Sequence, residues 1–246
     1  MNIRRLQIGL SEYATKIPGL AAYYSCGERT GANSSRDVST NALHGTPTSV
    51  TFGSTGQIGR AYTLDGAAST ISIGDVASLQ FERTNPFSIM AIVRKTTADA
   101  IGNIFAKMES TADNARTRGY RLAIFDNAGT NRLRFTLCND IASNALTMTG
   151  TTALSSTVTW YAVAVTYAGN SAPSDVNLYV NGVLETPITV GSNLSATIAN
   201  SIVARIGSRG TAQDQFFPGL TQHITIVNRV LNLNEVQKYA QLAGLS

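Results

Sequence analysis

Three oxygen-bearing side chains in polar loops are the best candidates for chemistry in this chain. Asp37 and Asn41 lie in a segment rich in Ser, Thr, Asn and Gly, and Asp65 precedes a glycine at the end of an alternating segment. A hard cation such as calcium binds several carboxylate, amide and carbonyl oxygens. These three residues are therefore candidate ligands of a structural calcium. The alternative is that Asp37 and Asp65 form turns by accepting hydrogen bonds from their own backbone.

The residue patterns that catalysis needs are missing, so we predict no catalytic residue and a protein that is not an enzyme. Glycoside hydrolysis uses two carboxylates that flank the scissile bond, and the acids here stand singly along the sequence. No serine in a G-x-S-x-G setting accompanies the two histidines, His44 and His223. We expect His44 to close its loop by a hydrogen bond, and His223 to be exposed or a satisfied core group.

Charge and cysteine usage exclude several classes of partner. The net charge of +4 comes from 19 basic residues that are scattered along the sequence instead of forming a stripe, which argues against nucleic acid as a partner. No segment approaches the ~20 apolar residues of a membrane helix, and residues 1–10 lack the apolar core of a signal peptide. We expect no membrane partner and no secretory signal. Cys26 and Cys138 then favour buried free thiols, with one long-range disulfide as the alternative.

Alternating segments predict the strands that position these residues. Residues 159–167 and 175–184 alternate large apolar with small or polar residues. Within the second of these, Asn181-Gly182 lies between Val180 and Val183 and fits a two-residue type I′ hairpin turn. Many short segments of this kind with turn residues between them indicate a sandwich or barrel. The predicted strands are residues 20–24, 48–52, 60–64, 70–73, 87–95, 104–107, 120–125, 133–138, 146–149, 160–167, 176–180, 183–185, 202–206 and 223–227.

Large aromatic side chains on these strands are predicted to fill the space between two sheets. The alternative for any one of them is a ring on which a sugar stacks. The residues concerned are Phe87, Phe105, Phe135, Trp160, Tyr161 and Tyr179.

The two ends of the chain differ from the rest. Leu6, Ile8 and Leu10 alternate with other residues, which predicts that residues 1–17 form a first strand or an extended arm that docks on a partner. Asn232 and Glu235 have the spacing of a capping box, and apolar residues follow at helical intervals. We therefore predict a short C-terminal helix.

Motifs in the order of a known family run from residue 19 to residue 242. Residues 37–46 are similar to a "D-x-S-x-N … H-G-T" loop, residues 59–66 to "G-x-A-x-x-F-D-G", and residues 104–107 to "I-F-S-K". Residues 87–94 resemble "F-T-V-S-A-W-V-K", and residues 206–235 resemble the closing "I-G … F-x-G-x-I-D-E-V … N-R-A-L-S … E-I". The chain thus resembles the laminin-G-like, concanavalin A-like jelly-roll domains. It departs from them at Leu64, at Ile92 and at residues 221–223, where the family's acids are absent.

The resemblance implies an all-β fold, a concanavalin A-like jelly-roll β-sandwich of two antiparallel sheets over residues 18–246, preceded by the arm. Laminin-G-like domains of this kind occur in tailed-phage virions. We therefore expect a non-enzymatic virion protein, a capsid decoration or a tail or fibre part, that docks on other virion or assembly proteins through the arm. It would act as a homo-oligomer or within a larger assembly, and it would present its sandwich to a glycan of the host. The alternative is a soluble carbohydrate-binding lectin.

Overall fold

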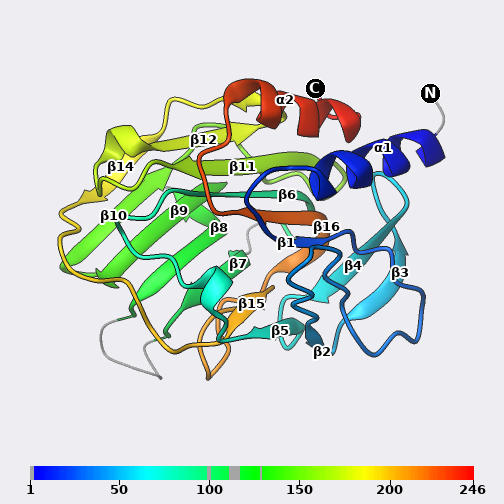
Figure 1. Ribbon diagram of the computed structural model, residues 1–246, viewed down its shortest axis with the longest axis horizontal. Helices are drawn as coiled ribbons and strands as arrows, with labels where there is room; N and C mark the ends of the chain where they lie inside the picture. The colour runs from blue at the N-terminus through cyan, green and yellow to red at the C-terminus, as the bar shows by residue number, and fades with distance from the viewer. Residues whose placement is uncertain (1–2, 99–100, 111–116, 128) are drawn as a thin grey trace.

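The computed structural model describes residues 3–98, 101–110, 117–127 and 129–246, and these form two antiparallel sheets packed face to face. Figure 1 shows the two layers, with one helix from each end of the chain lying together along one side. The predicted β-sandwich with a short C-terminal helix is therefore confirmed. None of the helices in the described ranges has the length and apolar character needed to cross a membrane.

The first sheet contains the hairpin from which the fold was predicted. Asn181 and Gly182 connect the two strands of this hairpin, Val176–Val180 and Val183–Leu184, with φ values of 52° and 76°, as a type I′ turn requires. Its strands, in spatial order, are β13 (Val183–Leu184), β12 (Val176–Val180), β11 (Tyr161–Tyr167), β6 (Phe87–Lys95), β16 (Pro218–Val227), β4 (Arg60–Asp65) and β3 (Thr51–Thr55), and β1 (Leu20–Tyr24) pairs with β16.

The second sheet has two long central strands that pair as an antiparallel hairpin, from Gly119 opposite Cys138 to Asn127 opposite Thr130. Its strands, in spatial order, are β14 (Ile188–Ser192), β10 (Asn144–Thr149), β9 (Thr130–Asp140), β8 (Gly119–Asn127), β7 (Gly102–Met108), β15 (Ala204–Ile206), β5 (Thr70–Gly74) and β2 (Thr46–Thr48). Two single 3-10 turns, Ala77–Leu79 and Pro173–Asp175, complete the regular elements of the described residues.

The main core lies between the two sheets, because every second residue of each strand points inward. Phe87, Phe105 and Phe135 are fully buried there, and Tyr161 packs against the same cluster. The prediction for these four aromatics is confirmed.

A second apolar layer lies on the outer face of the first sheet, under the two helices. Trp160 and Tyr179 belong to this layer and not to the space between the sheets, so their predicted position was wrong. Tyr179 occupies a position of β12 with the parity opposite to the core residues, and Trp160 directly precedes the core-facing Tyr161 of β11, so both side chains point away from the main core. Helix residues such as Leu10 and Tyr239 cover them, which gives the molecule a third layer.

The N-terminal segment forms helix α1 (Ile3–Thr15), so the predicted strand or extended arm was wrong. Leu10, Ala14 and Ile17 are buried, and their spacing of four and three residues follows one face of a helix. Alternation at Leu6, Ile8 and Leu10 is too short to distinguish a strand from a helix, and packing against the second helix decides the outcome. The docking role of residues 1–17 stays a prediction.

Helix α2 (Leu233–Leu242) begins at the predicted capping box. The Asn232 side chain accepts from the Glu235 backbone N–H at 3.0 Å, and the Glu235 carboxylate accepts from the Asn232 backbone N–H at 2.9 Å. The Tyr13 hydroxyl donates to the Glu235 carbonyl at 2.8 Å and so ties α1 to α2.

Several strand boundaries differ from the prediction. Residues 48–52 divide between β2 and β3, which belong to different sheets, and β15 is shorter than residues 202–206. Strand β16 begins five residues earlier than expected, at Pro218. Strand β14 was not predicted, since Gly191 and Ser192 interrupt its apolar alternation.

Candidate functional site

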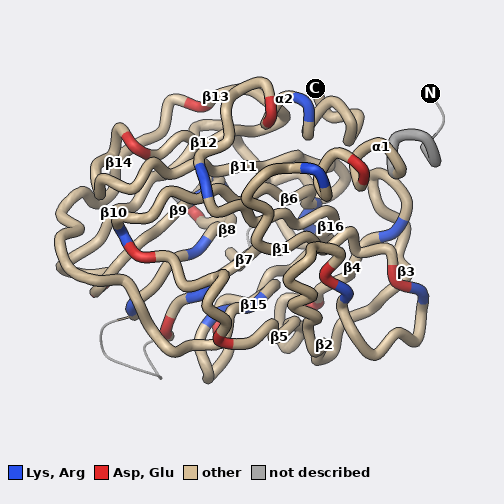
Figure 2. Tube along the Cα trace, in the orientation of Figure 1, with Lys and Arg blue, Asp and Glu red and all other residues tan. Residues whose placement is uncertain are grey.

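The outer face of the second sheet carries arginines on two adjacent strands. Arg121 lies on β8 and Arg134 on β9, and the register pairs Arg121 with Thr136 and Ala123 with Arg134. Residues at these positions have the parity opposite to the core residues Leu122 and Phe135, so both side chains point to the outer face. In Figure 2 basic positions gather around β8, β9 and β15.

Both guanidinium groups are placed over the same aromatic ring. The Cζ atoms of Arg121 and Arg134 lie 5.1 Å and 4.4 Å from the centroid of Phe125, within the range of cation–π attraction. Arg134 Nε also donates to Thr149 Oγ1 at 2.9 Å, and Arg121 donates to the Gln215 side-chain oxygen. These contacts fix the direction of both side chains.

Burial disfavours the positive charge of both arginines. Arg121 is only 2% exposed, and its Nε is buried without a hydrogen-bond partner. Burial, with a smaller effect from the nearby Arg209 guanidinium, lowers the pKa of Arg121 to about 9. Burial also lowers the pKa of Arg134, although the Asp126 carboxylate opposes this. Within the part of the chain that the structure describes, neither Arg121 nor Arg134 takes part in an ion pair.

A cavity of about 480 Å³ opens beside these arginines. Its polar lining comes from Arg121, Arg134, Thr136, Thr147, Thr189, Ser192 and Asn193, and its apolar lining from Ile141, Ala142, Ala145, Val190 and Gly191. Its size and mixture of polar and apolar groups are those of a small-molecule site. The described lining contains no acidic residue, and this cavity is the candidate functional site.

The loop of residues 208–215 borders the same face. Arg209 Nε lies 2.6 Å from Asp214 Oδ1, and the backbone of these two residues also pairs, which closes the loop into a compact turn. Gln215 follows this turn and reaches Arg121. The loop therefore supplies a neutral acceptor, Gln215, to Arg121. Its carboxylate, Asp214, forms an ion pair with Arg209 instead.

Two of the predicted calcium ligands lie together in the loop beside β1. Asp37 Oδ1 accepts from the backbone N–H of Tyr23 and of Ser39, both at 2.8 Å. Its Oδ2 accepts from the Ser39 hydroxyl at 2.7 Å and from the Leu43 backbone N–H at 2.8 Å. Asn41 Nδ2 donates to the Ala21 carbonyl at 2.8 Å. The donors around Asp37 suit a bare carboxylate and do not suit a cation.

The third predicted ligand, Asp65, lies elsewhere, at the end of β4. Its Oδ1 accepts from three successive backbone N–H groups, those of Ala67, Ala68 and Ser69, at 2.8–2.9 Å. These bonds, that of Ala68 first, lower the pKa of Asp65 to about 2. No group of three or more His, Cys, Asp or Glu among the described residues is arranged to hold a metal ion. The calcium site stays a prediction, and the described contacts of Asp37 and Asp65 are those of turn-forming residues.

The histidines and cysteines have structural surroundings. Nδ1 of His44 accepts from the Asp37 backbone N–H at 3.2 Å, which closes the loop as predicted. His223 is a fully buried core residue whose pKa burial lowers to about 3. Cys26 and Cys138 are buried free thiols, so that prediction is confirmed. Burial raises the pKa of both thiols, which makes them poor nucleophiles.

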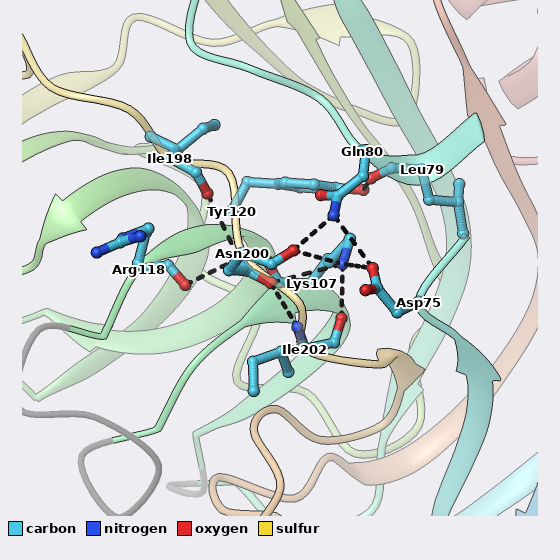
Figure 3. Close-up of polar contacts among 9 residues, drawn as sticks. All are labelled: Asp75, Leu79, Gln80, Lys107, Arg118, Tyr120, Ile198, Asn200 and Ile202. Atoms are coloured by element: carbon cyan, nitrogen blue, oxygen red, sulfur yellow. Dashed lines mark hydrogen bonds and ion pairs between the residues drawn. The ribbon is translucent and has the colours of Figure 1, made fainter. Parts of the chain in front are cut away.

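Figure 3 shows a buried lysine cluster at one end of the second sheet. Lys107 Nζ donates to Asp75 Oδ1 and to the Ile202 carbonyl, both at 2.6 Å, and lies 3.3 Å from the Asn200 carbonyl. The Asn200 side chain in turn donates to the carbonyls of Lys107 and Arg118. Burial lowers the pKa of Lys107. The cluster ties the segment before β15 to strands β7 and β8, and we assign it a structural role.

Sequence reasoning missed Arg121 and Arg134, because basic residues that are scattered in sequence gather in space. Each occupies the outward position of a strand whose core residues were recognised, so the alternation contained a signal. Their proximity depends on the β8–β9 register, which alternation alone does not give.

Solved structures with a similar fold include parts of toxins and glycosidases. The binding domain of Paraclostridial Mosquitocidal Protein 1 superposes with a TM-score of 0.66 at 15% identity, over 90% of this chain and 52% of that one. Domain 4 of AbnA, an extracellular arabinanase of Geobacillus stearothermophilus, was solved with arabinotriose. It gives a TM-score of 0.60 at 19% identity, over 90% of this chain and 98% of that one.

The sialidase of Trypanosoma rangeli in complex with sialic acid gives a TM-score of 0.63 at 14% identity, over 97% of this chain and 37% of that one. This chain thus spans about half of the toxin domain and a smaller share of the sialidase. At such identities the likeness shows the fold alone. No curated protein matches the chain by sequence.

Family membership rests on the sequence itself. The model of the laminin G type within the Concanavalin A-like lectin/glucanases superfamily matches residues 65–237, which is most of the chain and includes strands β5 to β16. The two antiparallel sheets and their order agree with that assignment. The chain therefore belongs to the laminin-G-like family of the concanavalin A-like lectin/glucanases superfamily.

Proposed function

We propose that this protein is a non-catalytic carbohydrate-binding module whose site is the cavity on the outer face of the second sheet. The observation that carries the proposal is the lining of that cavity, in which guanidinium and hydroxyl groups lie next to apolar side chains. Sugars need both kinds of surface, because their hydroxyls form hydrogen bonds while their C–H faces pack on apolar groups. Domain 4 of the arabinanase AbnA, which shares the fold, was solved with a bound oligosaccharide, and this supports the choice of ligand class.

Binding without hydrolysis follows from the residues at the cavity. Cleavage of a glycosidic bond uses a pair of carboxylates on the two sides of the sugar. The described lining offers arginines, threonines and small apolar residues, and none of these can act as the acid and base of that reaction.

A glycan array tests the proposal when it is combined with a steric block. Val190 lines the cavity and is 55% exposed, so Val190→Trp fills the site without disturbing the core. Val158→Trp is the matched control, because Val158 is 79% exposed and is not part of the lining. We expect saturable binding of one class of glycan by the wild type and by V158W, and its loss in V190W. No saturable binding, or binding that V190W leaves intact, would contradict the proposal.

We also propose, from the resemblance to tailed-phage proteins, that the module is part of a virion and assembles there through the N-terminal segment. Packing of Leu10 and Ala14 restricts which face of α1 can take part, and Ile8, which is 52% exposed, lies on the free side. Exposed apolar residues of this kind favour protein contacts.

Light scattering over a range of concentrations tests assembly as a homo-oligomer. Ile8→Glu should lower the mass toward that of a monomer with an unchanged melting temperature, while Val158→Glu should leave the mass unchanged. A wild-type protein that stays monomeric at all concentrations would leave residues 1–17 without a self-association role.

A further inference from the structure

The arginines at the cavity carry more positive charge than their surroundings balance. The Arg209 and Arg134 guanidinium groups act on Arg121 electrostatically, with Asp214 opposing them at Arg121 and Asp126 acting at Arg134. In the described residues the only ion pair among the three arginines is that of Arg209 with Asp214. A buried cation without a counter-ion loses hydration and gains little in return. An anionic group that enters the cavity would supply the missing partner.

The geometry directs this charge toward the cavity. Phe125 supports both guanidinium groups from one side, and Gln215 and Thr149 each take one donor. Arginine has five N–H donors, so several remain unused in each side chain. Arg121 Nε is one of them, because it is buried and has no partner. Both side chains line the cavity, and Arg134, which is half-buried where Arg121 is only 2% exposed, offers the more accessible of the remaining donors.

Threonine hydroxyls complete the site on the next strand. Thr136 and Thr147 lie opposite each other on β9 and β10, with their hydroxyl oxygens 3.4 Å apart, and both line the cavity. Hydroxyls at this position suit the hydroxyls of a sugar ring better than they suit a simple ion. The site thus pairs two cations with neutral hydrogen-bonding groups.

We propose that this cavity binds an acidic saccharide, whose carboxylate or sulfate accepts hydrogen bonds from the arginines of the lining, chiefly the half-buried Arg134, while its hydroxyls contact Thr147 and the exposed Thr189. This inference rests on the proposed function and specifies its ligand class. Guanidinium groups favour carboxylate and sulfate because two N–H groups can bind two oxygens of one anion.

The experiment uses pairs of probes that differ only in charge. The probes are tetragalacturonate and its methyl ester, sialyllactose and its methyl ester, and 3′-sulfolactose and lactose, measured by calorimetry with the intact chain. At least one acidic member should bind, and its neutral counterpart should bind at least about tenfold more weakly, as expected for the loss of a charge-assisted hydrogen bond. Inorganic sulfate is measured alone and should bind more weakly than the acidic saccharide.

The variant Arg134→Gln should weaken binding of the acidic member by about tenfold or more, and binding of its neutral counterpart by a clearly smaller factor, because a neutral sugar offers Arg134 only hydroxyl contacts. Arg134 is half-buried, so this change is tolerated better than one at Arg121. Arg132→Gln is the matched control, because Arg132 lies two residues away on β9, outside the lining, and its change of charge is identical. An acidic saccharide that binds R132Q and the wild type equally, and binds R134Q weakly, supports the inference.

Three results would contradict the inference and still be compatible with the proposed function. They are equal binding of acidic and neutral members at the cavity, equal weakening by R132Q and R134Q, and binding of sulfate as tight as that of the saccharide. If no saccharide of either kind binds, and the glycan array is also silent, the proposed function fails with it.

Discussion

The hydroxyl of Tyr23 lies 2.6 Å from Nδ1 of His223, in the buried region where both helices meet the first sheet. The same hydroxyl lies 3.0 Å from the Ser11 hydroxyl on α1, and the Tyr239 hydroxyl on α2 donates to the His223 carbonyl at 2.6 Å. His223 has a φ of 53° within a bulge of β16. One residue pair therefore joins both helices to the sheet.

Burial of His223 makes the stability of the fold depend on pH. Its pKa falls from 6.5 to about 3 on folding, so the unfolded chain binds a proton that the folded chain excludes. The free energy of unfolding is therefore unaffected by protonation of His223 above pH 6.5 and decreases as the pH falls from 6.5 toward 3. At pH 5 the loss relative to pH 8 is about 2 kcal/mol.

Replacement by asparagine isolates this effect. Asn tolerates the left-handed backbone at position 223 and does not titrate. We expect the free energy of unfolding of His223→Asn, measured with urea, to fall by about 2 kcal/mol less than that of the wild type between pH 8 and pH 5. If H223N and the wild type show the same slope, His223 is not the group responsible.

Removal of the Tyr23 hydroxyl should destabilise the protein at every pH. Tyr23→Phe leaves Nδ1 of His223 buried without its partner, which costs about 1–3 kcal/mol. Ser11→Ala is the matched control: it removes the other contact of the same hydroxyl and keeps the His223 bond, so we expect a loss below about 1 kcal/mol. Equal losses in the two variants would show that the His223 contact has no special weight.

Local chemistry made most of the fold predictable. The hairpin at Asn181 and Gly182 depends on backbone preferences of two adjacent residues, and the start of α2 depends on Asn232 and Glu235 within one helical turn. Helix α1 was not predictable in this way, because its buried face at Leu10 and Ala14 gains its stability from contact with distant residues.

The candidate site shows the same division between local and distant information. The outward position of Arg121 and of Arg134 follows from the alternation of each strand, so each could have been assigned to an outer face. Their placement over one Phe125 ring depends on the β8–β9 register, and the contact of Gln215 depends on a loop far along the chain. The sequence pattern therefore gives the components of the site and not their juxtaposition.

The buried ammonium of Lys107 supports a further prediction about stability. Lys107→Met leaves the Ile202 carbonyl without its donor and Asp75 without its ion pair, while the Asn200 carbonyl keeps its hydrogen bond from Gln80 Nε2. We expect a loss of about 2–4 kcal/mol in urea unfolding at neutral pH. Asp75→Asn should cost less, because the Asp75 side chain is 36% exposed and Lys107 retains both carbonyls. A K107M variant as stable as the wild type would mean that the cluster in Figure 3 does not fasten this end of the sheet.

The predicted calcium site can be tested against the turn-forming role of the same residues. Asp37 is buried, and each of its two oxygens accepts two hydrogen bonds. Asp37→Asn replaces one of these oxygens by an NH₂ group, which cannot accept from the donors around it. We expect a loss of about 3 kcal/mol in unfolding free energy, equal in calcium chloride and in EDTA. Asp65→Asn keeps an acceptor oxygen at an exposed turn and serves as the milder control. A bound cation would stabilise the wild type by mass action. If calcium raises the melting temperature of the wild type and not that of D37N, Asp37 is a calcium ligand, and its interpretation as a turn-forming residue is wrong.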